Sequence, residues 1–525
     1  MNFLLALQIN QLDLNFWYIL PELIVGVAGV VVMMVDAFAR PRQRWMTGGL
    51  ALAGLVAAAA SCVWLWVTHV GPNDMAFRKM IVLDEMRLSF TLIFIFVSAM
   101  TILISMVWVE SERLPAGEFH SLLLFATSGM MLMASGNDLV IIFLGLEILS
   151  IATYVMAGFR RSDLRSNESS LKYFILGSFS SAFLLYGIAL IYGATATNGG
   201  LPGTTNISLI AEQLNDSRYP ALLFAGAAMM LVGFGFKIAT APFHVWTPDV
   251  YEGAPTPVTA FMAAGPKAAG FASFLRVFIF GFPFVVASAG ALTTDAMLHN
   301  AWLTALSLLA IITMTVGNLV AIVQNNVKRM LAYSSIAHAG YALVGFVAAG
   351  AASDATRRTE ALAAVAFYML TYAVMNLGAF AVVTMISRKD DRRTEVEDYN
   401  GIGFRAPVLS FALSLFLLSM LGLPLTAGFM GKIMVFRSAL DMGYYALVII
   451  GVINTAISAY YYLRLIIVMF FRERTTEWSA PSVPVSITIA LVITVLGTFY
   501  LGLFPGRILD AFRKPPASAP VRVSR

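Results

Sequence analysis

The sequence has few of the residues that hold metals and redox groups. Its 525 residues include a single cysteine, Cys62, which excludes an intrachain disulfide, a Cys-ligated iron–sulfur cluster and a cysteine-based zinc site. Of the five histidines, only His244 and His338 fall deep within apolar segments, which leaves little for haem ligation. We therefore expect no cofactor site and no metal site in this chain.

Charged residues are also scarce. They make up 12% of the chain, against ~25% in ordinary soluble domains, whereas hydrophobic residues make up 59%. Apolar runs of about 20 residues or more recur from end to end, and each is long enough to cross a ~30 Å hydrocarbon core. A backbone in lipid must satisfy its hydrogen bonds within its own helix. The sequence therefore predicts an all-α polytopic membrane protein.

About fourteen transmembrane helices are predicted, and they group into regions. These regions are an N-terminal three-helix segment (1–118), a first five-helix repeat (119–282), a second five-helix repeat (301–471), a last helix (483–504) and a mobile, Pro-rich tail (505–525). Because five is odd, the second repeat starts from the opposite side of the membrane, so the repeats are inverted. Glu147 and His338 are separated by nearly the same distance in sequence as Lys237 and Lys432, which supports this alignment of the repeats.

Two predicted helices are too long for one straight span and contain helix breakers. Helix 7 (219–252) is interrupted by Pro242, and helix 12 (406–441) by Pro424 and neighbouring glycines. Broken helices at corresponding places in two repeats indicate a transport site, but Pro242 and Pro424 are only 182 residues apart, so these two breaks are not in register.

The connecting loops differ in charge. One side holds most of the loop Lys and Arg residues, among them Arg160, Arg161, Lys328 and Arg329. The positive-inside rule makes this side cytoplasmic and places both termini outside. The net charge of +5 reflects this asymmetry and does not imply nucleic-acid binding.

Four charged residues are predicted to lie deep in the membrane: Glu147, Lys237, Lys267 and Lys432. A charge at the bilayer centre costs ~2.5–3.5 kcal/mol even on the lenient insertion scale. Two interpretations stay open, a set of buried structural ion pairs or a path for protons. Burial disfavours a charged lysine and a nearby carboxylate favours it, so a lysine whose partner moves can carry a proton. We expect Glu147 to lie close to Lys237.

Other polar residues in the spans are ambiguous. His244 and His338 titrate near neutral pH, and each could relay protons or simply pack with a hydrogen bond. Lys172 lies a few residues into helix 6, where relaying a proton and reaching the interface are equally plausible. Arg276 and Arg464 lie near the ends of their spans, from which we expect them to reach the membrane surface.

Two long motifs resemble a known family. The first runs from Phe236 to Pro257 (FKIATAPFHVWTPDVYEGAPTP) and continues to Lys267, and the second runs from Lys328 to Tyr341 (KRMLAYSSIAHAGY). Both resemble the antiporter-like membrane subunits of respiratory complex I. Within that family, the TPDVYEGAPTP run is most similar to the group called subunit N in bacteria, the counterpart of mitochondrial NADH dehydrogenase subunit 2.

The resemblance implies a role for the buried charges. The family has a glutamate in helix 5 and lysines in helices 7, 8 and 12, which correspond here to Glu147, Lys237, Lys267 and Lys432. Sister subunit M has a glutamate at the last position, so Lys432 favours the subunit N group. The implied function is proton translocation coupled to quinone reduction, with His244, His338 and Lys172 as secondary relays.

The resemblance also implies the setting. NADH, FMN, iron–sulfur clusters and quinone belong to partner subunits, and the partners are other membrane-arm subunits and the lipid bilayer. The location is the bacterial inner membrane, with both termini periplasmic.

Two other functions stay open. A subunit of a multisubunit cation/proton antiporter would share this repeat and exchange sodium for protons without redox coupling. A purely structural membrane subunit is disfavoured, because it would have no use for four charges near the midplane.

Overall fold

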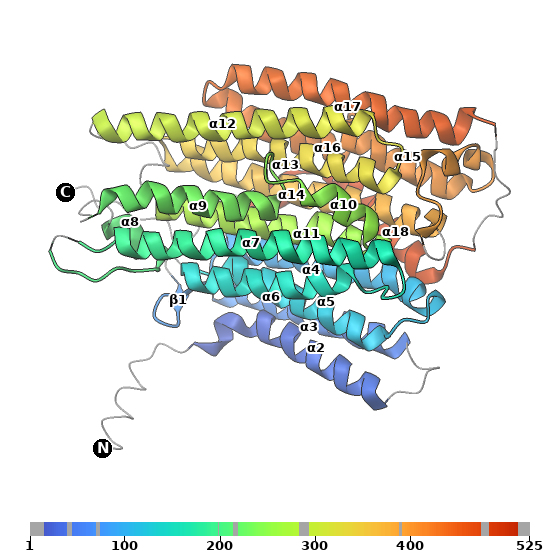
Figure 1. Cartoon of the computed structure of the whole chain (residues 1–525), viewed down its shortest axis with the longest axis horizontal. Coiled ribbons are helices and arrows are strands. Elements are labelled where there is room, and N and C mark those ends of the chain that lie inside the picture. The colour runs from blue at the N-terminus through green and yellow to red at the C-terminus, as the bar shows by residue number, and fades with distance from the viewer. Residues whose placement is uncertain are drawn as a thin grey trace.

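The structure of the chain is a computed structural model that describes residues 15–38, 45–69, 74–197, 199–213, 219–282, 293–387, 391–473 and 482–512. Within these residues, long helices with roughly aligned axes form a single bundle, and one short hairpin is the only sheet (Figure 1). The long apolar runs become helices because only a helix bonds all of its backbone internally.

The N-terminal segment consists of three long helices and the hairpin. Its elements are η1 (Phe16–Ile19), α2 (Leu20–Phe38), α3 (Trp45–Thr68), β1 (Met75–Ala76), β2 (Ile81–Val82) and α4 (Glu85–Ser111). The two strands pair antiparallel, with Met75 opposite Val82. Asp84 caps α4, since its carboxylate accepts a hydrogen bond of 2.7 Å from the backbone N–H of Arg87.

The next block corresponds to the predicted first repeat. Its elements are α5 (Ala116–Ser135), α6 (Leu139–Ala157), α7 (Leu164–Ala194), α8 (Ile207–Gln213), α9 (Pro220–Ile238), α10 (Trp246–Gly253), α11 (Thr256–Leu275) and the π-helical turn η4 (Arg276–Phe280). Glycines bring α5 and α6 into close contact. A Cβ on Gly145 would lie 2.8 Å from the carbonyl oxygen of Gly129, so only glycine permits this approach.

The second block and the C-terminal helices complete the bundle. Their elements are α12 (Thr293–Ile322), α13 (Val327–Ala351), α14 (Ala355–Ser387), η7 (Val396–Tyr399), η8 (Ile402–Phe404), α15 (Pro407–Leu421), α16 (Ala427–Asp441), α17 (Tyr445–Phe471), α18 (Val485–Leu503) and α19 (Gly506–Phe512). Residues 506–512 of the expected tail thus form a helix. Residues 513–525 lie outside the described part of the chain.

The two predicted helix breaks are confirmed. Helix 7 is divided into α9 and α10 by residues 239–245, where Ala239 has a left-handed backbone with φ of 60°. Helix 12 is divided into α15 and α16 by residues 422–426, and Gly422 ends α15 with φ of 104°, a conformation that favours glycine.

The two blocks run in opposite directions, as inverted repeats require. One end of the bundle, which we call the basic end, holds the loops with Arg160 and Asp391 and the first turn of α13 with Lys328. Arg160 and Lys328 both contact Asp391 there. In the first block α5 begins at this end, whereas in the second block α12 ends at it. In Figure 1, α10 and α15 lie towards the basic end and β1 lies at the opposite end.

Eleven helices of the described residues are long and apolar enough to cross a membrane, or up to twelve if a bent helix pair counts as one span. The expected number of about fourteen is not confirmed. α5, α11 and the half-helices α15 and α16 lie where spans were predicted, but they are not among the eleven. α15 and α16 are too short singly, and α11 is buried throughout, so its sequence need not be apolar enough for lipid. The chain is a multi-pass membrane protein.

The core of the bundle is formed by three helices that carry candidate residues or their neighbours. Every residue of α11 is buried, and so are nearly all residues of α13 and most of α14. In Figure 1, α2 and α17 lie at opposite edges of the bundle with α11, α13 and α14 between them. Outer helices such as α7 and α17 expose apolar side chains, as expected for surfaces facing lipid or partner subunits.

Candidate functional site

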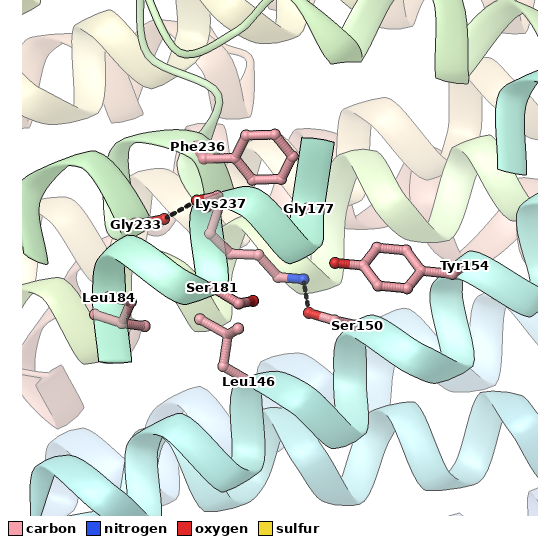
Figure 2. Close-up of a pocket in the computed structure, with 10 residues that line it drawn as sticks. Leu146, Ser150, Tyr154, Gly177, Ser181, Leu184, Gly233, Phe236 and Lys237 are labelled. Carbon is pink, nitrogen blue, oxygen red and sulfur yellow. Dashed lines mark hydrogen bonds between the residues drawn. The ribbon is translucent and has the colours of Figure 1, made fainter. Parts of the chain in front are cut away.

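Lys237 lies in the last turn of α9, just before the break in helix 7. Its side chain is buried, and its amine donates a hydrogen bond of 3.0 Å to the hydroxyl of Ser150 on α6. The amine also lies 6.0 Å from the centre of the Tyr173 ring. The break thus places Lys237 where its amine reaches α6 (Figure 2).

A small cavity surrounds the Lys237 amine. Its lining comes from α6, α7 and α9 and consists of Leu146, Ser150, Tyr154, Gly177, Ser180, Ser181, Leu184, Gly233, Phe236 and Lys237. The amine and the Tyr154 hydroxyl point towards the same space (Figure 2). The cavity offers about 10 Å³ to the centre of a water molecule, which is close to the minimum for one water.

Glu147 lies on α6, next to Leu146 of the cavity lining, and its side chain is half-buried. Its carboxylate accepts a hydrogen bond of 2.5 Å from Ser181 on α7. In the described residues no direct ion pair joins Glu147 to Lys237, so the expected contact is indirect. Ser150 and Ser181 both line the cavity, and they place one hydroxyl next to each charge.

Lys267 lies in the middle of α11 and contacts α13. Its amine donates hydrogen bonds to the backbone oxygen and to the hydroxyl of Ser335. The amine lies 5.7 Å from the centre of the Tyr372 ring on α14. Lys267 is thus held by three core helices and is buried, with 1% of its surface exposed.

His338 lies on α13, one turn beyond Ser335, inside a group of tyrosines. Its Nδ1 lies 2.6 Å from the hydroxyl of Tyr368, and its Nε2 lies 3.3 Å from the hydroxyl of Tyr462. Its ring centre lies 4.8 Å from that of Tyr372 and 5.8 Å from that of Tyr341. Both ring nitrogens therefore have a hydroxyl partner, as a relay between hydroxyl groups requires.

Lys432 lies on α16, just beyond the break in helix 12. Its amine donates a hydrogen bond of 3.0 Å to the carbonyl oxygen of Leu421, the last residue of α15. The amine lies 4.8 Å from the centre of the Tyr341 ring. The last carbonyls of a helix lack partners within the helix and carry partial negative charge. The break thus supplies a binding place for the Lys432 amine.

The two remaining candidates lie nearer the basic end. His244 is half-buried in the segment between α9 and α10, and its buried Nδ1 has no hydrogen-bond partner among the described residues. The amine of Lys172 lies 2.7 Å from Glu168 and 2.9 Å from Asp249, and its side chain is 42% exposed. Lys172 therefore belongs to a half-exposed ion network rather than to the buried core.

The prediction for one further charge is wrong. Arg276 does not reach the membrane surface, because its guanidinium is fully buried and lies 2.8 Å from the carboxylate of Asp84. The prediction failed because its partner lies far away in the sequence, at the start of α4. Arg464 does reach loop groups at the basic end, where it donates to the backbone oxygens of Ile322 and Gln324.

The hydroxyl partners of the charges were missed by the sequence analysis. They are the hydroxyl groups of Ser150, Ser181, Ser335, Tyr368 and Tyr462, and the rings of Tyr372 and Tyr341 lie against the amines of Lys267 and Lys432. Two signals were present in the sequence. Ser335 precedes His338 by three residues, and Tyr368 and Tyr372 are four apart, so each pair shares a helix face. In the described part of the chain, no group of three or more His, Cys, Asp or Glu side chains could hold a metal ion.

Comparisons with known proteins identify the family. The family described as "NADH:quinone oxidoreductase/Mrp antiporter, TM" matches residues 136–458. The chain is 44% identical over 499 residues to NADH-quinone oxidoreductase subunit N of Trichlorobacter lovleyi, and the match covers 95% of this chain and 96% of that protein. The chain belongs to the NADH:quinone oxidoreductase/Mrp antiporter family of membrane subunits. The resemblance to the subunit N group is confirmed.

Two solved structures agree with the fold. A chain of respiratory complex I from Thermus thermophilus with bound aureothin is 35% identical, with a TM-score of 0.74 over 94% of this chain and 99% of that chain. A chain of the Mrp complex from Dietzia sp. DQ12-45-1b has a TM-score of 0.77 over 95% of this chain and 96% of that chain, at 19% identity, so it supports the fold alone. Both neighbours are chains of multisubunit complexes.

Proposed function

We propose that this chain translocates protons as a membrane-arm subunit of NADH–quinone oxidoreductase in the bacterial inner membrane. It acts as a translocase subunit, driven by quinone reduction in partner subunits that hold the NADH, FMN, iron–sulfur and quinone sites. The basic end faces the cytoplasm and both termini face the periplasm, as the loop charges predict.

One observation carries this proposal. Lys237, Lys267 and Lys432 are buried, yet each amine bonds a hydroxyl or carbonyl oxygen, and in the described residues none has a carboxylate within ion-pair distance. A structural ion pair would hold its lysine charged, because separating buried opposite charges is strongly unfavourable. Lysines without such a partner suit groups that accept and release protons.

The proposed path uses the aromatic and hydroxyl groups between the charges. A proton passes from Glu147 and Lys237 to Lys267, then through His338 to Lys432, the exit group. Tyr372 lies against both Lys267 and His338, and Tyr341 lies against both His338 and Lys432, so a tyrosine borders each of the last two intervals. His244 and Lys172 serve as secondary relays nearer the basic end.

The test is proton pumping by the intact complex in proteoliposomes, driven by NADH and quinone. Lys237→Met should abolish most pumping while the complex still assembles. The matched control is Lys79→Met, which removes an exposed lysine in the hairpin and should leave pumping unchanged. Normal pumping by Lys237→Met would contradict the proposal. Sodium-for-proton exchange without NADH would instead support the cation/proton antiporter.

A further inference from the structure

Asp391 lies at the basic end, after α14, in a buried position outside the candidate proton path. Its carboxylate lies 3.3 Å from the amine of Lys328 and 3.4 Å from the guanidinium of Arg160. It also accepts hydrogen bonds from the backbone N–H of Thr256 at 3.2 Å, from the Thr256 hydroxyl at 2.8 Å and from the Ser387 hydroxyl at 2.9 Å. One carboxylate thus binds four residues.

These partners come from both blocks of the bundle. Arg160 follows α6 and Thr256 is the first residue of α11, both in the first block, whereas Lys328 lies in the first turn of α13 in the second block. Arg160 also pairs with Glu112 at 3.1 Å. Arg160 and Lys328 are predicted loop charges, but both are buried, with 3% and 0% of their surfaces exposed.

The network joins the two helices that carry the centre of the proposed proton path. Lys267 lies eleven residues after Thr256 on α11, and Ser335 lies seven residues after Lys328 on α13. Both helices start near Asp391 at the basic end. They contact each other again further along, where Lys267 donates hydrogen bonds to Ser335. At 1.5 Å per residue, Ser335 lies only ~10 Å along α13 from Lys328.

α13 is a continuous helix between Lys328 and Ser335, so the position of its first turn sets the position of Ser335, the residue that Lys267 contacts. The structure assigns Asp391 as a positioning residue for proton transfer: its carboxylate holds the first turns of α11 and α13 together and thereby keeps Lys267 in contact with Ser335. This inference rests on the proposed function, because it concerns the alignment of the same path. Removing the carboxylate leaves two buried cations without their shared partner, which strongly favours separation of the helix ends.

The experiment uses the intact complex with Asp391→Asn and Asp391→Glu. In Asp391→Asn, turnover per assembled complex should fall by roughly 10- to 100-fold, the effect of misplacing a reacting group by about 1 Å. The KM for quinone should not change, because the quinone site lies in partner subunits. Backbone amide hydrogen exchange should rise in the first turns of α11 and α13. Asp391→Glu, which keeps the charge, should restore most of the turnover. The matched control is Asp354→Asn, at an exposed carboxylate near the opposite end.

Two results would overturn the inference. The first is faster exchange in α11 and α13 with normal turnover, which would make Asp391 merely structural. The second is slow turnover with unchanged exchange, which would show that Asp391 does not act by holding the helix ends together. If Lys237→Met abolishes most pumping as expected, either of these results would leave the proposed function intact.

A milder variant covers the case in which Asp391→Asn does not assemble. Thr256→Val removes only the hydroxyl that donates a hydrogen bond to Asp391, and it keeps both the β-branched shape and the charges. It should raise exchange at the start of α11 and lower turnover by about threefold, less than the loss in Asp391→Asn, because the backbone N–H of residue 256 still bonds Asp391. The control is Thr384→Val on α14, whose hydroxyl bonds only its own helix at Phe380. Equal turnover in the two variants would overturn the inference.

Discussion

The amine of Lys432 and the carbonyl oxygen of Leu421 are joined by a hydrogen bond of 3.0 Å across the break in helix 12. The two residues belong to different half-helices, α16 and α15, which residues 422–426 connect. The contact binds the proposed exit group to a neutral oxygen rather than to a carboxylate. A proton leaving Lys432 therefore leaves no fixed negative charge behind at that oxygen.

Lys432→Arg is expected to preserve assembly and to stop proton transfer. Arginine keeps the positive charge but does not release its proton in the working pH range. Pumping per assembled complex, measured as acidification in proteoliposomes, should fall by at least ~10-fold, equivalent to ~1.4 kcal/mol. Arg437→Lys provides the control, since Arg437 lies five residues further along α16 with its side chain 75% exposed. Normal pumping in Lys432→Arg would show that charge alone suffices at this position.

Ser150→Ala is expected to slow proton transfer between Glu147 and Lys237. The change removes the hydroxyl that accepts the hydrogen bond of the Lys237 amine and makes the cavity less polar. A hydrogen bond to a charged group contributes ~1.5–3 kcal/mol, so the pumping rate should fall by about 10-fold or more. Ser438→Ala on α16, whose hydroxyl bonds only the Met434 backbone, is the control. If both variants pump at the same rate, the serine contact plays no part in transfer.

Arg276→Met is expected to lower stability without changing the pumping of the complexes that assemble. It leaves the buried Asp84 carboxylate without its partner, and breaking a buried ion pair costs ~3–5 kcal/mol. The yield of assembled complex and its thermal midpoint should both fall. The double variant with Asp84→Asn should recover part of the loss, because the unpaired charge is removed. A loss of pumping per assembled complex would mean that Arg276 belongs to the proton path.

The stabilising effect of Asp391 is expected to depend on pH. Burial by itself would raise the pKa of this carboxyl, but the charges of Lys328 and Arg160 and the hydrogen bonds from Thr256 and Ser387 hold the pKa below its usual value. Because the pKa is lower in the folded state, the stabilisation is complete above the unfolded pKa of about 3.9 and is lost as the pH falls through the folded pKa.

The measurement compares thermal unfolding of complexes with Asp391 and with Asp391→Asn from neutral pH downwards. The stability difference should stay constant down to about pH 4 and then shrink as the carboxyl becomes protonated. A difference that grows with acidification would contradict the assigned direction of the pKa shift.

The sequence was sufficient to predict where the helices lie along the chain, but not which polar side chains contact one another. A helix lies in every range where the apolar runs predicted a span, although only eleven or twelve spans of the described residues are long and apolar enough to cross a membrane. Pro242 and Pro424 lie within the two observed breaks. The hydroxyl partners could not be predicted, because Ser181 meets Glu147 from another helix and the rotation of α7 decides which of its serines faces inward. Asp84 and Asp391 were missed for a related reason, since each finds its partners only when segments far apart in the sequence pack together.

The contact between Gly129 and Gly145 fixes the position of α6 against α5. The backbones of α5 and α6 touch there, so α6 cannot slide along α5 without a steric clash. Glu147 lies on α6 two residues beyond Gly145, so its backbone is held in place by the same contact. α9, which ends at Ile238, one residue after Lys237, is packed just as closely, since a Cβ on Gly226 of α9 would lie 3.0 Å from the carbonyl oxygen of Gly187 on α7. The gap between these two charges can therefore change without movement of either helix, through rotation of the flexible four-carbon stem of Lys237.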